Sequence, residues 1–86
     1  MITAGIDVGS NAVKCVVLDS PSDEQNEVLS RAVLRVRGRA LDEVIRAAYD
    51  KALQSAGKTE DEVEYLATTG EGEVVDFRTG HFYSMT

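Results

Sequence analysis

The sequence predicts an α/β domain with a mixed sheet and the element order β-β-β-α-β. Three observations predict it: apolar residues alternate along residues 2–8 and 27–37, β-branched residues fill 12–18, and an apolar stripe with helical spacing runs through 41–56. The chain has 86 residues, of which 43% are apolar and 28% charged. This length and composition fit one domain or part of one, and they exclude a disordered or low-complexity chain.

Two strands joined by a tight turn open the chain. Alternation predicts the first strand over residues 2–8, and the turn formers at 9–11 lead into a second strand over 12–18, which makes a hairpin. Residues 19–26 are polar, hold the only proline and are expected to form a loop. The apolar face of the first strand consists of Ile2, Ala4, Ile6 and Val8.

The third strand is expected over residues 27–37, with Ala32, Leu34 and Val36 facing inward. Its outward positions and the turn that follows carry a basic stripe, Arg31, Arg35, Arg37 and Arg39. Such a stripe could bind an anion or a partner. We favour a solvated outer face on an edge strand, where charge discourages pairing with another sheet.

Residues 41–56 predict an amphipathic helix, and Gly57 suits its C-terminal end. The start of this helix lacks an obvious capping side chain. Thr59 and Glu62 have the spacing of a capping box, which predicts one helical turn before a fourth strand over 63–68. The apolar stripe of the helix consists of Leu41, Val44, Ile45, Ala48, Ala52 and Leu53.

The order of these elements brings two glycine-bearing segments together. A right-handed crossover through the helix places the strand over 63–68 parallel to the strand over 2–8. The segments DVGSN (7–11) and TTGEG (68–72) then lie side by side at the sheet edge where α/β proteins bind ligands. TTGEGE could bind substrate or couple ATP to a partner, and it fits a plain turn equally well. The pattern of residues 74–86 favours neither a helix nor a strand.

The strongest local signal is DVGSN followed by Lys14. Asp7 ends a strand expected to be buried, where a carboxylate without a partner costs several kcal/mol, and hydrated magnesium would be a suitable partner. Gly9 lets the backbone approach a ligand, Ser10 and Asn11 offer donors, and Lys14 supplies a cation for phosphate oxygens. A plain hairpin turn with a surface Asp and Lys is the alternative. The P-loop and dinucleotide-binding glycine fingerprints are absent.

The net charge and the cysteine content exclude several classes of partner and of metal site. The formal net charge of −6 argues against nucleic acid and anionic membranes as partners, although one local phosphate ligand stays possible. Neither a membrane-spanning run nor a signal peptide is present, so a cytoplasmic location is expected. With a single cysteine, Cys15, the chain can form neither an internal disulfide nor a cysteine-only metal site. We expect Cys15 to be a small core residue.

GIDVGSNAVKCVVLD resembles the first phosphate loop of the actin, sugar-kinase and heat-shock-chaperone ATPases, which share a ribonuclease H-like fold. YLATTGEGEVVDFRTGHFYSMT is similar to the corresponding stretch of the BadF/BadG/BcrA/BcrD ATPase family. Dehydratase activators of that family carry a TGYGR-like loop where this chain has TGEGE. The departure favours the branch of D-type subunits that serve ATP-dependent benzoyl-CoA reductases.

The resemblance implies that residues 1–86 are the first, truncated part of an actin-like ATPase lobe. Asp7 would then be the catalytic residue that holds magnesium through water, and Gly9, Ser10, Asn11 and Lys14 would bind the phosphates of ATP. An iron–sulfur cluster, with ligands outside this chain, and other reductase subunits are implied as cofactor and partners. ATP hydrolysis in the family drives electrons to the reductase, and these 86 residues alone are expected to be inactive.

Two alternatives stay open at this point. The chain could begin a sugar or acyl kinase of the same superfamily, with TTGEG facing a hydroxyl substrate. It could also be a small interaction domain without enzymatic activity that reuses the same sheet.

Overall fold

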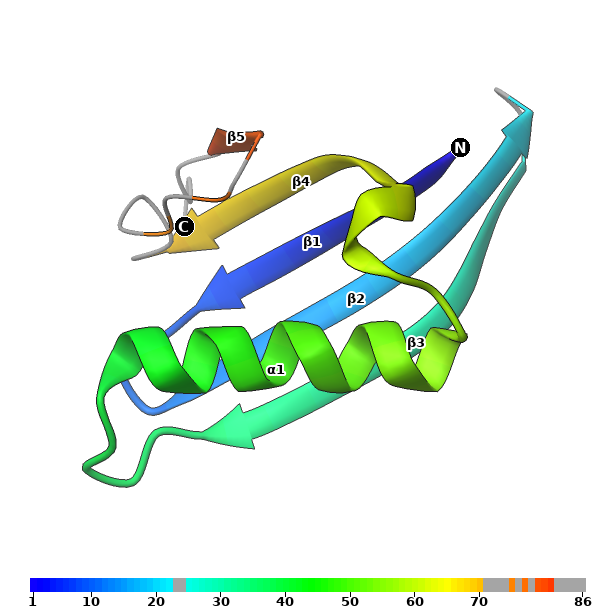
Figure 1. The fold of residues 1–86 in the computed structure, drawn as a ribbon. Coiled ribbons are helices and arrows are strands. Elements are labelled where there is room, and N and C mark those ends of the chain that lie inside the picture. Colours follow the sequence, from blue (N-terminus) through cyan, green and yellow to red (C-terminus); the bar gives the residue numbers. More distant parts are fainter. Residues whose placement is uncertain (23–24, 71–74, 76, 78, 82–86) are drawn as a thin grey trace.

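The computed structural model describes residues 1–22, 25–70, 75, 77 and 79–81. Their order confirms β-β-β-α-β and adds a short strand at the end (Figure 1). The elements are β1 (Ile2–Val8), β2 (Ala12–Ser22), β3 (Gln25–Arg35), α1 (Leu41–Ala56), a 3₁₀ turn (Glu60–Glu62), β4 (Val63–Gly70) and β5 (Gly80–His81).

Within the described residues, five strands form one sheet in the order β3-β2-β1-β4-β5. β2 pairs antiparallel with both β1 and β3, whereas β4 pairs parallel with β1 and with β5. The helix α1 carries the chain from β3 at one edge across to β4, on the far side of β1 (Figure 1). The predicted parallel crossover is therefore confirmed, and it brings the ends of β1 and β4 together.

The structure corrects the expected loop over residues 19–26. β2 continues to Ser22 and β3 begins at Gln25, so the hairpin is longer than predicted. The polar composition is misleading because this part of the ladder lies at the margin of the sheet. Pro21 lies past Asp19, the last β2 residue that pairs with β1, so its missing N–H costs no bond to that strand. At its other end, β3 stops at Arg35 rather than at residue 37.

The hydrophobic core lies between α1 and one face of the sheet. Ser30 is buried in this layer, and its Oγ donates a hydrogen bond to the backbone carbonyl of Ala52 at 2.6 Å. Cys15 is buried as expected, and burial raises the pKa of its thiol to about 12. The buried apolar residues are Ala4, Ile6, Val8, Val13, Cys15, Val17, Ala32, Val44, Ile45, Ala48, Tyr49, Ala52, Leu53, Leu66 and Val75.

Tyr49 is the core residue that the predicted apolar stripe omits. Its side chain is almost completely buried and stacks on Phe77, with ring centroids 5.5 Å apart. The guanidinium of Arg46 lies over both rings, 5.7 Å from the Tyr49 centroid and 5.3 Å from that of Phe77. Arg46 also pairs with Glu60 ahead of β4. This cluster ties Phe77 to the helix.

The ends of α1 form as the sequence predicts. Ala40 precedes the helix without a side-chain cap, and Gly57 ends it at a φ of 69°. Thr59 and Glu62 form the expected capping box around the 3₁₀ turn. None of the helices in the described ranges is long and apolar enough to cross a membrane.

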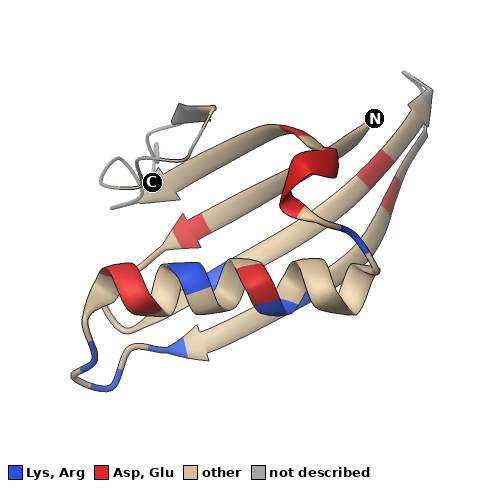
Figure 2. Ribbon diagram, in the orientation of Figure 1, with Lys and Arg blue, Asp and Glu red and all other residues tan. Residues whose placement is uncertain are grey.

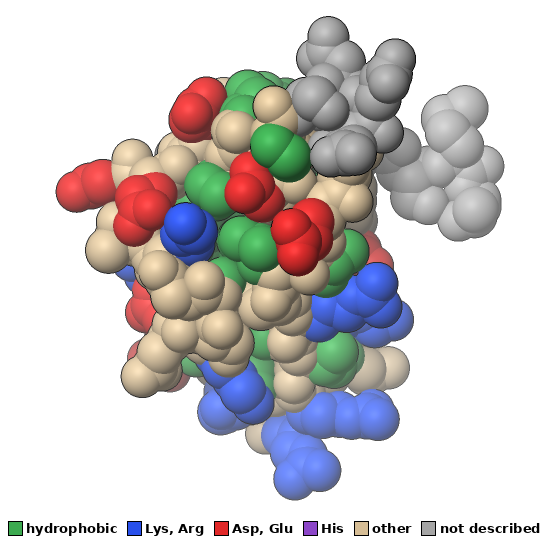
Figure 3. Space-filling model, turned by 90° about the vertical axis from the view of Figure 1, so that its right-hand side faces the viewer, with side chains coloured by type: hydrophobic (Ala, Val, Ile, Leu, Met, Phe, Trp, Pro, Cys, Tyr) green, Lys and Arg blue, Asp and Glu red, His purple; other side chains and the backbone are tan. Residues whose placement is uncertain are grey.

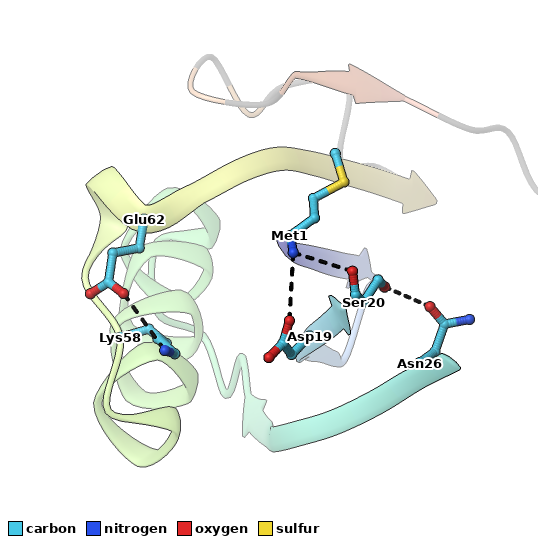
Figure 4. A network of polar contacts seen from close by, with 6 residues as sticks. All are labelled: Met1, Asp19, Ser20, Asn26, Lys58 and Glu62. Carbon is cyan, nitrogen blue, oxygen red and sulfur yellow. Dashed lines mark hydrogen bonds and ion pairs between the residues drawn. The ribbon is translucent and has the colours of Figure 1, made fainter. Parts of the chain in front are cut away.

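Polar contacts hold the end of the sheet where β1 begins (Figure 4). The amino group of Met1 lies 3.6 Å from the carboxylate of Asp19 and donates a hydrogen bond to the carbonyl of Ser20 at 3.2 Å. Lys58 forms an ion pair with Glu62 at 3.7 Å. Asp7 lies at the opposite end of β1.

Candidate functional site

Asp7 lies on the sheet face that α1 does not cover. The alternation of β1 buries Ile6 and Val8 against the helix and leaves the side chain of Asp7 exposed. The sequence predicts a carboxylate at the end of a buried strand with a high desolvation cost. The predicted desolvation cost is wrong, because the strand is buried on one face only and Asp7 lies on the other. Folding therefore leaves the Asp7 carboxylate hydrated, and a ligand can reach it from solvent.

Three polar side chains form a row across three strands at this place. In the strand register Asp7 is opposite Lys14 of β2 on one side and Thr69 of β4 on the other. The Thr69 hydroxyl donates a hydrogen bond to Asp7 Oδ1 at 2.9 Å. Lys14 is exposed and makes no ion pair with any residue that the structure describes. A carboxylate and a cation without an ion pair to any described residue thus lie on the same open face. The role of these residues in binding phosphate stays a prediction.

The turn between β1 and β2 is compact. The Gly9 N–H donates a hydrogen bond to the Ala12 carbonyl at 3.0 Å, and a Cβ at Gly9 would lie 3.1 Å from that oxygen. A side chain at position 9 would therefore crowd the turn, so glycine suits this position apart from any role in binding. Ser10 and Asn11 are exposed, and the Asn11 carbonyl accepts a hydrogen bond from Val36 N–H at 2.9 Å. This last bond anchors the turn to the segment after β3.

The end of β4 reaches further than the predicted strand over 63–68. Thr68, Thr69 and Gly70 belong to β4, and Thr69 and Gly70 pair with Asp7 and Val8 of β1. The expectation that the two glycine-bearing segments lie side by side is confirmed for this part. The remaining residues of TTGEGE, 71–73, lie outside the described residues. No local signal in the sequence singles out Thr69, because its place beside Asp7 depends on the register of two strands that are distant in the chain.

The open face forms a hollow of about 530 Å³ whose lining includes Asp7, Lys14 and Thr69. Its floor is built from small or branched residues of the central strands, Gly5, Val16 and Ala67, and Arg31 and Val33 of β3 lie at its side. Seen from the end of the sheet where β1 begins, Lys and Arg side chains gather low in the view and Asp and Glu lie mostly above them (Figure 3). The cations that line the hollow itself are Lys14 and Arg31. A negatively charged ligand at this face would meet cations although the whole chain is acidic.

The donor set at the hollow fits some metals and excludes others. No group of three or more His, Cys, Asp or Glu that could hold a metal occurs within the described ranges. One exposed carboxylate does suit magnesium, which usually keeps several waters and binds through one or two carboxylates together with substrate phosphates. The buried thiol of Cys15, with its raised pKa, does not suit an iron–sulfur cluster.

The basic stripe occupies the edge strand, as the favoured interpretation expects. β3 is at the edge of the sheet, and basic residues gather at its end and in the connection to α1 (Figure 2). The guanidinium of Arg39 donates hydrogen bonds to the carbonyls of Arg35 and Val36. At least this arginine stabilises the turn itself.

Comparison with known proteins bears on the same segments. The profile of the BadF/BadG/BcrA/BcrD ATPase family matches residues 4–86. The chain belongs to this family. It is 47% identical over 85 residues to the D-type subunit of benzoyl-CoA reductase from Thauera aromatica, a match that covers 99% of this chain and 30% of that protein. The chain thus spans about 30% of the length of this relative.

Solved structures share the fold. Component A of the (R)-2-hydroxyglutaryl-CoA dehydratase of Acidaminococcus fermentans superposes with a TM-score of 0.80 at 24% identity, over 96% of this chain and 30% of that one. The activator of the 2-hydroxyisocaproyl-CoA dehydratase from Clostridium difficile, with bound ADPNP, gives 0.77 at 17% identity, over 96% and 29%. These similarities confirm the actin-like ATPase type of fold that the sequence predicts.

Proposed function

We propose that this chain is the first part of the ATP-hydrolysing, electron-activating subunit of a benzoyl-CoA reductase and carries its first phosphate-binding segment. The 47% identity to the D-type subunit of such a reductase carries the proposal. The row of Asp7, Lys14 and Thr69 across three neighbouring strands, where β1 and β4 end, supports it. The family match supports this function over a sugar or acyl kinase and over an interaction domain without enzymatic activity.

In this proposal Asp7 holds a hydrated magnesium ion, and Lys14 contacts phosphate oxygens of ATP. Bound magnesium would neutralise charge that develops on the phosphates. The protein's own contribution is to place one carboxylate and one cation at fixed positions on a rigid sheet. Backbone and side-chain donors of Ser10 and Asn11 would orient the phosphates at the turn. Gly9, whose own N–H donates to the Ala12 carbonyl, would let the backbone approach them closely. Positioning and electrostatic stabilisation are the main contributions that phosphoryl transfer requires from a protein.

The remaining parts of the function lie beyond these residues. We infer that other segments of a longer protein complete the nucleotide site, because this chain spans 30% of its relative. The cluster that receives the electrons would take its cysteine ligands from there, since Cys15 is buried among apolar residues. Subunits of a reductase are the proposed partners, and the cytoplasmic location stays a prediction.

The test uses the full-length protein that carries this sequence. ATP hydrolysis is measured against magnesium and ATP concentration for the natural protein, Asp7→Asn, Lys14→Met and Lys51→Met. Asp7→Asn removes the charge but keeps an acceptor for Thr69, so we expect an intact fold and turnover lower by about 100-fold or more. Lys14→Met should raise the ATP concentration for half-maximal turnover by about tenfold, the equivalent of one charge-assisted hydrogen bond.

Lys51→Met serves as the matched control, because Lys51 is exposed on α1, away from the hollow. Unchanged turnover in Asp7→Asn would contradict the proposed site. Phosphoryl transfer to a hydroxyl compound rather than to water would favour the kinase instead. The electron-activating part is tested in the assembled reductase, where reduction of benzoyl-CoA should stop when ATP is withheld.

A further inference from the structure

The carboxylate of Asp7 accepts a hydrogen bond from Thr69 on β4. Thr69 is not part of the proposed phosphate-binding segment. We propose that Thr69 is a positioning residue that fixes the carboxylate of Asp7 for magnesium, and that Gly70 is the residue that allows Thr69 to reach it. This inference rests on the proposed function, since it concerns the same carboxylate. It adds a second segment of the chain, distant in sequence, to the machinery of the site.

A hydrogen bond joins the side chains of Thr69 and Asp7. Thr69 Oγ1 donates to Asp7 Oδ1 at 2.9 Å, and the two residues are register partners in the parallel pair β1–β4. Among the described residues, no other side-chain hydrogen bond or ion pair involves Asp7. The bond thus restrains one carboxylate oxygen, while no described side chain occupies the other, which can accept from metal-bound water. Partners that orient a metal-binding carboxylate in this way affect metal affinity although they do not touch the metal.

The backbone next to Thr69 also lies against β1. Gly70 has a φ of 66°, and a Cβ on it would lie 2.3 Å from the Val8 carbonyl oxygen and 3.4 Å from Asp7 Oδ1. The Val8 side chain is buried in the core at 1% exposure, so a shift of β1 to make room would disturb the core packing. The end of β4 therefore stays pressed against β1 only with glycine at this position.

A merely structural role for Thr69 predicts different behaviour. Thr69 is partly exposed at the rim of the open face, where water can replace a lost hydrogen bond. Valine has nearly the shape of threonine and a high β propensity, so Thr69→Val should fold. If the hydroxyl served only stability, its loss would leave the response to magnesium unchanged.

The experiment compares Thr69→Val, Thr69→Ser and Thr3→Val in the full-length protein. Thr3 is on the same strand and the same sheet face as Asp7, which makes Thr3→Val the matched control for loss of a hydroxyl. We expect Thr69→Val to raise the magnesium concentration for half-maximal ATP turnover by about tenfold, and Thr69→Ser to stay within about threefold of the natural protein. Thr3→Val should leave it unchanged.

Calorimetry of ATP binding gives a readout that does not depend on turnover. The natural protein should bind ATP more tightly when magnesium is present, and Thr69→Val should lose most of this gain while its magnesium-free affinity is unchanged. Thr69→Ala repeats the test if the valine variant does not fold.

A Thr69→Val protein that responds to magnesium like Thr3→Val would overturn the positioning role and leave the proposed function intact. A natural protein that neither binds nor hydrolyses ATP would instead remove the proposed function, and the positioning role with it.

Discussion

The two faces of β1 differ in burial and in the chemistry of their side chains. On one face, Ile6 and Val8 are almost completely buried under α1. On the other, Asp7 is exposed beside Lys14 and Thr69. Alternation along a strand thus lets three consecutive residues serve the core and the candidate site at once. The packed face holds the backbone still, and the open face carries the polar groups on that rigid support.

The difference also separates stability from chemistry. Changes on the covered face should cost free energy of unfolding, whereas changes on the open face should alter ligand binding and leave the fold intact. Variants at three places can test this separation, two on the sheet and one at the contact between α1 and the 3₁₀ turn that precedes β4.

Ile6→Ala should have the largest effect on stability. It removes a fully packed side chain from the covered face, and large-to-small changes of this kind cost about 3 kcal/mol. Its neighbour Asp7→Asn should change the free energy of unfolding by about 0.5 kcal/mol or less, because it is an exposed substitution. Chemical denaturation of both variants in the full-length protein measures the contrast. Equal losses of stability would show that the two faces are not independent.

Gly70→Ala should cost about 2 kcal/mol, because it combines an unfavourable positive φ with a clash against the Val8 carbonyl. Gly57→Ala is the matched control. Gly57 has a similar φ of 69° at the end of α1, but a Cβ there would meet nothing within 4 Å. We expect the control to cost about 1 kcal/mol and to keep ATP turnover.

Gly70→Ala should in addition reduce ATP turnover at temperatures where it is still folded. Thermal denaturation and turnover measured on both glycine variants separate the two effects. If Gly57→Ala lost as much turnover as Gly70→Ala, the close contact between β4 and β1 would not matter to the site.

The smallest effect concerns Glu60 at the edge of the covered face. The hydrogen bond from Arg46 lowers the pKa of the Glu60 carboxyl below its ordinary value of 4.5. A carboxyl with a lowered folded-state pKa stabilises the fold above its unfolded pKa, and this contribution disappears as the pH falls through the folded pKa. Because Glu60 is exposed, Glu60→Gln should cost below about 1 kcal/mol at neutral pH.

Denaturation between neutral pH and about pH 3 measures this gap, which should close in the acidic range as the natural carboxyl is protonated. Glu64→Gln, an exposed change on β4 in a similar position along the chain, is the control. A gap that persists unchanged at low pH would mean that the side chain of Glu60 acts through packing rather than charge.

Local patterns are sufficient for most of the fold. Alternation predicts β1 to the residue, and helical spacing with Gly57 predicts α1 to the residue. The pattern misses Tyr49 because a tyrosine can face solvent or core, although its position four residues after Ile45 belongs to the buried stripe. The polar segment around residues 19–26 is predicted as a loop, because nothing in its composition shows that β2 and β3 continue to pair beyond β1.

The candidate site likewise has a part that local sequence predicts and a part that it does not. Asp7, the turn over 9–11 and Lys14 are close in sequence, so hairpin geometry alone determines that Asp7 and Lys14 face each other across β1 and β2. Thr69 lies 62 residues from Asp7, and no local pattern in TTGEG distinguishes a turn from a strand end. Only the parallel pairing of β4 with β1 decides that its hydroxyl meets the carboxylate. The physical reason is that short-range propensity determines which residues alternate and turn, whereas register between distant strands depends on how α1 packs the crossover onto the sheet.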